Sequence, residues 1–358
     1  MEDSHVQDPI AELITNYNEL NSSFIEELDE EPSALEFMRF VARNTPFVVR
    51  GAAADWQATQ TWTVDYLKDF LGDELVNVAV TPFGNADAPT LYTPPSSDTS
   101  TLVFAKPHEE PQPFSSFLTY LTTQELQPPS PNNPHGQQEE EEEVRYAQTQ
   151  NDNLRHEYAA LLAHVPRTIP WARLALARDP DAVNLWIGNA RSVTALHRDN
   201  YENVYVQVAG RKHFVLLPPV CQPCVAERGL RPAHYRRRRR ASSAGDGDGG
   251  GGGGGLELVL DEGGGEGEEG QEEVPFAVWD PDRPAENATR YSALVQPMRV
   301  TLNPGDMLYL PCMWYHKVSQ SCSPEGVCIA VNYWYDMDFT GPLYPLSTFV
   351  RSVSNEKK

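Results

Sequence analysis

The sequence of 358 residues predicts a mainly β fold with helices, of the sandwich or jelly-roll type. Many short apolar runs of strand length follow residue 181, and Gly, Pro and Asn separate them, which is typical of such folds. Before that point, several apolar patterns have helical spacing. We therefore expect an N-terminal region at residues 1–180 that packs on a β core at 181–340, with a C-terminal tail at 341–358.

Three helices are predicted in the N-terminal region. Ser33 is expected to cap the first and Thr63 the second, and the third is expected to start near Ser115. Gly72 marks the end of the second helix, and a strand is predicted after it at residues 77–81. The faces expected to be buried are Leu35, Met38 and Val41 in the first helix, Val64, Leu67 and Leu71 in the second, and Phe117, Leu118 and Leu121 in the third.

Seven short strands are predicted in the β core from runs of β-branched, aliphatic and aromatic residues. Residues 209–212 (AGRK) are predicted to form a tight hairpin between two of them, and residues 303–305 (NPG) form another turn. The predicted strands lie at residues 183–187, 193–199, 204–208, 213–217, 300–302, 307–310 and 328–333.

Two segments have no apolar face and are predicted to be disordered insertions. Residues 127–143 are rich in Pro, Asn and Glu, and residues 236–273 contain long runs of Arg and Gly. Such segments cannot bury enough apolar surface to offset the entropy lost on ordering. The arginine run leaves a nuclear-import signal open as an alternative to a loop without a role.

The charge balance argues against several classes of protein. The chain has 28 Lys and Arg against 51 Asp and Glu, a net charge of −23, whereas nucleic-acid binders need clustered basic residues. No apolar run approaches the ~20 residues that span a bilayer, and the first residues do not resemble a secretory signal. The five cysteines are therefore expected to be free thiols in a reducing compartment. We expect a cytoplasmic protein with no nucleic-acid or membrane partner.

Three residues are candidates for a metal site. His197 and Asp199 are two positions apart on a predicted strand, so their side chains face the same side. His316 can reach the same point from a second strand. Two imidazoles and one carboxylate form the facial set that leaves positions open for substrate and oxygen on non-heme Fe(II). Because the chain has nine histidines, ordinary surface or core histidines are the alternative.

The cysteines offer a competing metal interpretation. Cys221 and Cys224 form a CxxC pair, and Cys322 and Cys328 lie far downstream. A structural zinc site needs four ligands, and this spacing matches no zinc finger closely.

Longer motifs surround the three candidate ligands. His197 and Asp199 lie in TALHRDNYEN at residues 194–203, and His316 lies in NPGDMLYLPCMWYHKV at residues 303–318. With these motifs the sequence resembles the JmjC 2-oxoglutarate oxygenases, and among them the small stand-alone lysyl hydroxylases that act on developmentally regulated GTP-binding proteins. The resemblance runs from about Asp8 to the C-terminus outside the two insertions. It includes PFVVRG at 46–51, DAVNLWIG at 181–188 and AVNYWYDM at 330–337.

The resemblance implies a double-stranded β-helix of the cupin type that uses Fe(II), 2-oxoglutarate and molecular oxygen. His197, Asp199 and His316 match the iron ligands of the family. Thr194 and His197 are three positions apart, so in a regular strand their side chains would point to opposite faces. Because both match site residues, a bend or bulge is expected between them. Five residues match the 2-oxoglutarate site of the family: Lys212, which would pair with the distal carboxylate, Tyr146 and Thr194 as hydroxyl donors to it, and Asn203 and Asn332 near the chelating end. Each has a structural alternative; Lys212, for example, could be an ordinary lysine at a hairpin tip, and Tyr146 an ordinary strand aromatic.

By the same resemblance, the expected reaction is hydroxylation of a protein side chain, most simply a lysine, with no catalytic residue beyond the metal ligands. A histone lysine demethylase and a non-catalytic cupin-type binding protein are the alternatives. Glu202, Asp336 and Asp338 are candidates for an acid that holds the substrate ammonium. The expected partner is a protein with a target lysine, such as a GTP-binding protein, and a homodimer stays open.

Overall fold

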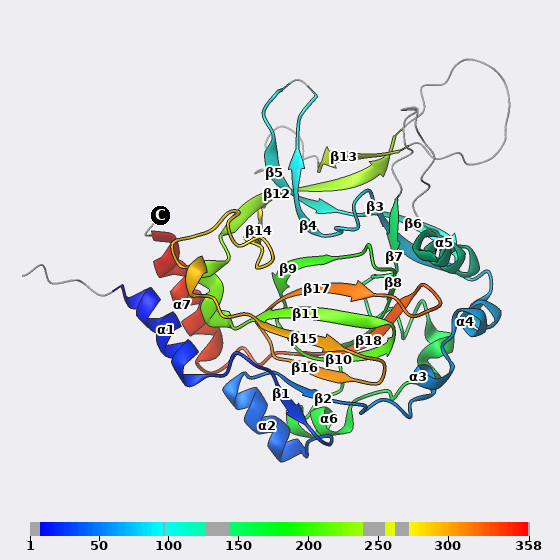
Figure 1. Cartoon of the computed structure of the whole chain (residues 1–358), viewed down its shortest axis with the longest axis horizontal. Helices are drawn as coiled ribbons and strands as arrows, with labels where there is room; N and C mark the ends of the chain where they lie inside the picture. Colours follow the sequence, from blue (N-terminus) through cyan, green and yellow to red (C-terminus); the bar gives the residue numbers. More distant parts are fainter. Residues whose placement is uncertain (1–7, 96, 127–142, 239–254, 262–271, 357–358) are drawn as a thin grey trace, which may run out of the picture.

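Two facing sheets form the centre of the computed structural model, which describes residues 8–95, 97–126, 143–238, 255–261 and 272–356 (Figure 1). The six-stranded sheet has the order β1-β2-β16-β10-β18-β8, and the four-stranded sheet has the order β15-β11-β17-β9. The strands of the six-stranded sheet are β1 (Glu26–Leu28), β2 (Phe47–Val49), β8 (Ala182–Gly188), β10 (Tyr201–Ala209), β16 (Met307–Leu310) and β18 (Cys328–Asp336). Those of the four-stranded sheet are β9 (Thr194–Arg198), β11 (Arg211–Leu217), β15 (Met298–Leu302) and β17 (Tyr315–Ser321).

The chain passes from one sheet to the other at six connections. They join β8 to β9, β9 to β10, β10 to β11, β15 to β16, β16 to β17 and β17 to β18. This alternation winds the chain as a double-stranded β-helix, so the predicted fold class is confirmed.

The hairpin predicted at residues 209–212 is wrong. The turn is tight and Gly210 has a φ of 68°, but β10 pairs with β16 and β18, whereas β11 pairs with β15 and β17. A Cβ on Gly210 would lie 2.7 Å from the carbonyl oxygen of Ser321, so the close approach also requires glycine. Two apolar runs around a short turn look alike in a hairpin and in a corner between sheets, and only long-range pairing separates the two.

The three predicted helices are all present, and two of them bury the predicted faces. Ser33 accepts the backbone N–H of Glu36, and Thr63 accepts that of Tyr66, so both caps act as expected. The predicted faces of α4 and α5 are buried, and the predicted strand at residues 77–81 lies within β3 (Leu75–Thr81). The helices of the region are α1 (Pro9–Leu20), α2 (Ala34–Arg43), α3 (Gln57–Thr61), α4 (Val64–Leu71), α5 (Phe114–Leu126), the short 3₁₀ helix η1 (Ala159–His164) and α6 (Pro170–Leu176).

Helix α2 buries a different face from the predicted one. Phe37 and Phe40 are buried, whereas Leu35 and Met38 are 64% and 51% exposed. The ring of Phe37 packs edge-on against Trp171 of α6 and Tyr309 of β16, with centroids 4.6 and 4.8 Å away. Both faces of α2 carry apolar residues, and the face with the two aromatic rings has more apolar area to bury.

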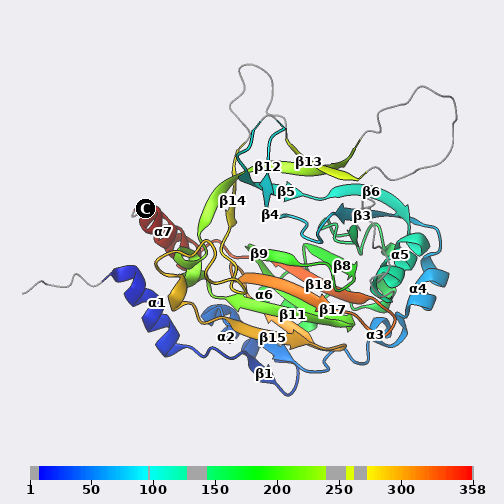
Figure 2. The same ribbon diagram turned by 45° about the horizontal axis from the view of Figure 1, so that its top comes forward.

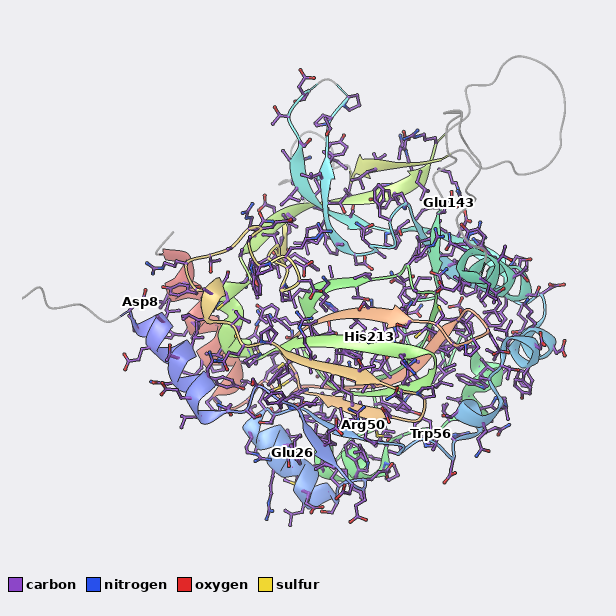
Figure 3. All side chains as sticks on the ribbon, in the orientation of Figure 1. Asp8, Glu26, Arg50, Trp56, Glu143 and His213 are labelled. Atoms are coloured by element: carbon purple, nitrogen blue, oxygen red, sulfur yellow. The ribbon has the colours of Figure 1, made fainter. Side chains whose placement is uncertain are left out.

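Two smaller sheets close the upper side of the core (Figure 2). One has the order β6-β3-β7, and the other has the order β13-β12-β5-β4 with β14 paired to β12. Arg237, at the end of β12, connects the two smaller sheets through ion pairs with Glu110 of β6 and with Glu143 beside β7. Figure 3 labels Glu143. The strands not yet delimited are β4 (Ala88–Tyr92), β5 (Thr101–Lys106), β6 (His108–Pro113), β7 (Val144–Tyr146), β12 (Glu227–Arg237), β13 (Leu256–Leu260) and β14 (Val274–Ala277).

Part of the predicted insertion at residues 236–273 is folded. Arg236 and Arg237 continue β12, and β13 pairs with this strand antiparallel, with Leu256 opposite Arg237. Leu256 is buried in the main hydrophobic core together with Tyr235. The prediction of disorder is therefore wrong for the apolar LELVL sequence at residues 256–260. The remainder of that insertion, at 239–254 and 262–271, and residues 127–142 of the other insertion lie outside the described residues.

The predicted C-terminal tail contains a helix, α7 (Leu343–Glu356). It packs on the 3₁₀ helix η2 (Pro219–Cys224), which α1 and a third 3₁₀ helix, η3 (Ser292–Leu294), also contact, and Figure 1 shows α1 and α7 on the same side of the molecule. Within the described ranges, no helix combines the length and the apolar character that crossing a membrane requires.

Candidate metal centre

Three side chains from β9, from the loop after it and from β17 converge between the two sheets. His197 lies directly opposite His316 in the pairing of β9 with β17, and their ring centroids are 4.1 Å apart. The Asp199 Oδ2 atom lies 3.8 Å from His197 Nε2 and 3.7 Å from His316 Nε2. Across the described part of the chain, this is the one group of three or more His, Cys, Asp or Glu residues placed to hold a metal ion.

Backbone carbonyls fix the orientation of both imidazole rings. The Nδ1 atom of His197 lies 2.8 Å from the carbonyl oxygen of Ala195, and that of His316 lies 3.1 Å from the carbonyl oxygen of Trp314. Each Nδ1–H therefore donates to a carbonyl, which leaves the Nε2 lone pair directed toward Asp199 and available to a metal. Burial lowers the pKa of His316 to about 4, and the neighbouring His197 acts in the same direction. His316 is thus neutral, as a metal ligand must be.

The three residues open into a cavity of about 600 Å³, which is within the range of small-molecule sites. All five residues matched to a 2-oxoglutarate site line the same cavity: Tyr146, Thr194, Asn203, Lys212 and Asn332. The structure thus brings together eight residues that are spread over more than 180 positions of sequence, from Tyr146 to Asn332.

Lys212 is the most deeply buried cationic group of this cavity wall. Its side chain is 2% exposed, and its Nζ atom donates a 2.8 Å hydrogen bond to the hydroxyl oxygen of Tyr146. Burial alone would lower the pKa of Lys212, but the adjacent phenols of Tyr146 and Tyr205 outweigh burial and hold this pKa above its usual value. Burial has the opposite effect on Tyr146 and raises its pKa, so the pair is an ammonium beside a neutral phenol.

The charge of Lys212 has no carboxylate partner among the residues that the structure describes. A buried ammonium without a counter-ion is costly unless a ligand supplies one. The site therefore fits a ligand with a carboxylate at this end of the cavity, such as 2-oxoglutarate.

Gly188 makes room for the ring of Tyr146. A Cβ atom at this position would lie 2.6 Å from ring carbon Cδ2 of Tyr146 and 2.7 Å from Nε2 of Gln320. Such distances are far below van der Waals contact, so only glycine lets β7 place the phenol against Lys212.

A bulge in β9 brings Thr194 to the same side as His197. His316 pairs with His197 and Val318 pairs with Thr194, so one residue of β17 spans two residues of β9. His316 and Val318 are two positions apart and share a face, and therefore so do their partners. The bulge that strand parity requires is thus present, and Thr194 lines the cavity.

Asn203 and Asn332 form a hydrogen-bonded pair near the triad. Asn332 Nδ2 donates to Asn203 Oδ1 over 3.1 Å, and Asn332 Oδ1 accepts from Trp186 Nε1 over 2.8 Å. Both amides are buried, and Asn203 and Asn332 come from the neighbouring strands β10 and β18. Their orientation is therefore fixed before any ligand binds.

None of the three acids expected to hold a substrate ammonium lines the cavity. Glu202 alternates with Asn203 on β10 and faces the opposite side, where it accepts hydrogen bonds from the Tyr309 hydroxyl and the Cys312 N–H. Asp336 lies near Arg178, and Asp338 accepts a hydrogen bond from Thr340. Proximity to a motif in sequence does not specify the face of a strand or the direction of a loop.

Several other cavity residues were not predicted as site residues. Tyr205 follows Asn203 by two positions on β10, and strand alternation could have identified it. Asp87, before β4, and Glu227, at the start of β12, carry no local signal that would place them near the triad. Their position depends on how the smaller sheets close over the core.

The cysteine pair does not form a metal site in the described structure. Cys221 and Cys224 are buried among the apolar residues of η2 and its neighbours, and no third ligand joins them within the described residues. Two imidazoles and one carboxylate are instead the donor set of non-heme Fe(II), and the triad fits that ion.

Comparisons with known proteins agree with this geometry. Residues 32–341 match the family model of the cupin-like domain. The chain is 36% identical to the human bifunctional peptidase and (3S)-lysyl hydroxylase JMJD7 over 87% of this chain and 84% of that protein. It is 33% identical to the Arabidopsis thaliana lysine-specific demethylase JMJ32 over 88% and 82%, and 29% identical to JmjC domain-containing protein E of Dictyostelium discoideum over 97% of both chains. The chain therefore belongs to the cupin-like JmjC family.

Proposed function

We propose that the protein is an Fe(II)- and 2-oxoglutarate-dependent dioxygenase that hydroxylates a lysine side chain of another protein. The observation that carries the proposal is the presence of the His197, Asp199 and His316 triad and the unpaired Lys212 ammonium in one cavity. The JmjC family supports the class of reaction, a 2-oxoglutarate-dependent hydroxylation or demethylation. The choice of lysine hydroxylation is supported by the similarity to the human lysyl hydroxylase.

In this proposal each residue has a binding or orienting role. His197, Asp199 and His316 hold Fe(II) on one face and leave the opposite face to ligands. Lys212, with the hydroxyls of Tyr146 and Thr194, binds the distal carboxylate of 2-oxoglutarate. When bound, the iron and 2-oxoglutarate supply the oxidising power that inserts one atom of molecular oxygen into a C–H bond.

The surroundings of the triad suit this role. The rings of Trp186, Tyr205 and Phe214 line the cavity and limit the access of bulk water. The amides of Asn203 and Asn332 line the same cavity and are fixed by their hydrogen bonds to one another and to Trp186. No separate acid–base pair is needed, because binding and orientation are what the protein has to supply.

Histone lysine demethylation is the second candidate, and it is favoured by the similarity to the plant demethylase. The two reactions share cofactors and differ in the product. Hydroxylation leaves an added oxygen atom on the lysine, whereas demethylation removes a methyl group from a methylated one. A non-catalytic binding protein would convert no 2-oxoglutarate with any peptide.

The test is an incubation of the full chain with Fe(II), 2-oxoglutarate, ascorbate and lysine peptides, followed by mass spectrometry. Two sets of peptides are used, one from GTP-binding proteins and one from methylated histone tails. We expect a gain in mass of one oxygen atom on an unmodified lysine, with succinate formed in equal amount. Loss of one methylene from a histone peptide would favour demethylation instead. If no set changes, or if the His197→Ala variant turns over as fast as the wild type, the proposal is wrong.

A further inference from the structure

Asp87 occupies an unusual position in the wall of the metal cavity. It lies in the turn just before β4 and has a φ of 52°, in the left-handed region that non-glycine residues rarely adopt. Aspartate tolerates this conformation better than most residues, but the structure must still compensate its cost. The turn places the carboxyl group in the cavity that also contains His197.

The carboxyl of Asp87 is held by a neutral partner. Gln148 Nε2 donates a 3.0 Å hydrogen bond to Oδ2, and no cationic side chain of the described residues lies within ion-pair distance. The nearby ammonium of Lys106 is engaged by Asp261, 2.5 Å away. Burial raises the pKa of Asp87, and Glu109 adds to this, whereas His197 and Lys106 act in the opposite direction. A half-buried carboxyl in this state gains stability from any cation that enters the cavity.

Asp87 is also the one cavity carboxylate of the described residues that is free for such a cation. The cavity contains three: Asp87, Asp199 and Glu227. Asp199 belongs to the triad, and Glu227 Oε1 lies 2.5 Å from both Nε and Nη2 of Arg351 on α7. Asp87 and His197 line the same cavity, so the carboxyl and the metal centre share one space.

The location also suits a side chain that enters from a polypeptide. Asp87, Gln148 and Gln150 line both the metal cavity and a second hollow of about 420 Å³, which Lys106, His108 and Glu109 border. The two hollows thus adjoin at Asp87, Gln148 and Gln150. A peptide that lies across this junction can direct one side chain past the carboxyl toward the triad.

We propose that the Asp87 carboxylate, held in place by Gln148, binds the side-chain ammonium of the substrate lysine. The assignment rests on the proposed lysine hydroxylation and names the residue that would select lysine over a neutral side chain. It replaces Glu202, Asp336 and Asp338 in that role.

The test compares binding of two probes that differ in the ammonium alone. Nα-acetyl-L-lysinamide and Nα-acetyl-L-norleucinamide are titrated, without oxygen, into the full chain loaded with Fe(II) and 2-oxoglutarate, and binding is followed by NMR. We expect the wild type to bind the lysine probe about tenfold more tightly than the norleucine probe, because a hydrogen bond to a charged group contributes this much. Asp87→Asn should abolish the preference and leave the affinity for the norleucine probe unchanged.

The matched control is Asp336→Asn, which removes the same charge outside the cavity and should keep the preference. A wild type that binds both probes equally, or an Asp87→Asn variant that keeps the preference, would overturn the assignment. So would equal weakening of both probes in Asp87→Asn, which would indicate a structural role.

Catalysis separates this inference from the proposed function. A wild type that prefers the lysine probe but modifies no peptide would refute the lysyl hydroxylase and leave the ammonium site standing. A wild type that hydroxylates a lysine peptide, with an unchanged KM in Asp87→Asn, would refute the ammonium site alone.

Discussion

The Nζ atom of Lys212 on β11 donates a 2.8 Å hydrogen bond to the hydroxyl of Tyr146 on β7, which belongs to a different sheet. The bond therefore joins the four-stranded sheet of the β-helix to the small sheet contributed by the N-terminal region. Tyr146 in turn packs on Gly188 of β8. Residues from three parts of the fold thus form a binding group for a carboxylate. Replacing any one of them should weaken the binding of 2-oxoglutarate more than the binding of the metal.

Replacing Lys212 tests this group directly. In Lys212→Met the apolar stem stays buried while the charge is lost, so the KM for 2-oxoglutarate should rise by at least about tenfold. Affinity for Fe(II), measured without oxygen, should stay within about twofold, a change well under 1 kcal/mol. The reason is that Lys212 shares no hydrogen bond or ion pair with a triad residue. Tyr146→Phe keeps the cation and should have the smaller effect. An unchanged KM in Lys212→Met would show that 2-oxoglutarate binds elsewhere.

Gly188→Ala should also weaken the binding of 2-oxoglutarate, in this case by disturbing the packing of Tyr146. The new methyl group must displace the Tyr146 ring, which is buried and cannot move without drawing its hydroxyl away from Lys212. We expect the free energy of unfolding in urea to fall by about 1–3 kcal/mol and the KM for 2-oxoglutarate to rise several-fold. Gly255→Ala is the control, because a Cβ there meets no atom of the described residues within 4 Å. Equal behaviour of the two variants would contradict the tight contact.

Because of Asp261, the free energy of unfolding should depend on pH in the acidic range. Burial raises the pKa of Asp261, but hydrogen bonds from Lys106 of β5 and His234 of β12 outweigh burial and lower it overall. A lowered carboxyl pKa contributes stability above the unfolded value, about 3.9. This stability is lost as the pH falls through the folded value. Asp261→Asn should therefore cost about 1–2 kcal/mol at pH 7 and progressively less below pH ~3.9.

Urea unfolding of wild type and variant across this pH range measures the effect. Asp179→Asn is the comparison, since Asp179 pairs with Arg173 at the surface and exposed pairs contribute little. A difference between wild type and Asp261→Asn that stays constant from neutral to acidic pH would rule out the ionised carboxylate as its source.

The sequence predicted the fold class and the convergence of the three candidate metal ligands better than it predicted the residues around them. His197 and Asp199 follow from strand alternation, and the conflict in parity at Thr194 correctly required a bulge. The motif around His316 came from resemblance, because no local rule brings β17 opposite β9. What local patterns could not supply is the choice between two apolar faces in α2, and the closure of the smaller sheets over the cavity.

Asp87 illustrates that limit. It lies in a turn of ordinary composition, far in sequence from every motif, and it lines the metal cavity because β4 and β5 belong with β12 to the sheet above the core. Glu202 shows the converse, since it is adjacent to Asn203 in sequence and faces away from the site. Sites at the junction of sheets depend on contacts with large sequence separation.

The most direct test of the account is the binding of Fe(II) to the triad, measured by calorimetry in the absence of oxygen. The wild type should bind one ion per chain, and His197→Ala, Asp199→Ala and His316→Ala should each weaken binding by at least about tenfold. His213→Ala is the control, because His213 lies on β11 outside the cavity (Figure 3). Its ring nitrogens form hydrogen bonds with the hydroxyls of Thr301 and Ser321. Triad variants that bind Fe(II) as tightly as the wild type and His213→Ala would show that His197, Asp199 and His316 are not the metal site.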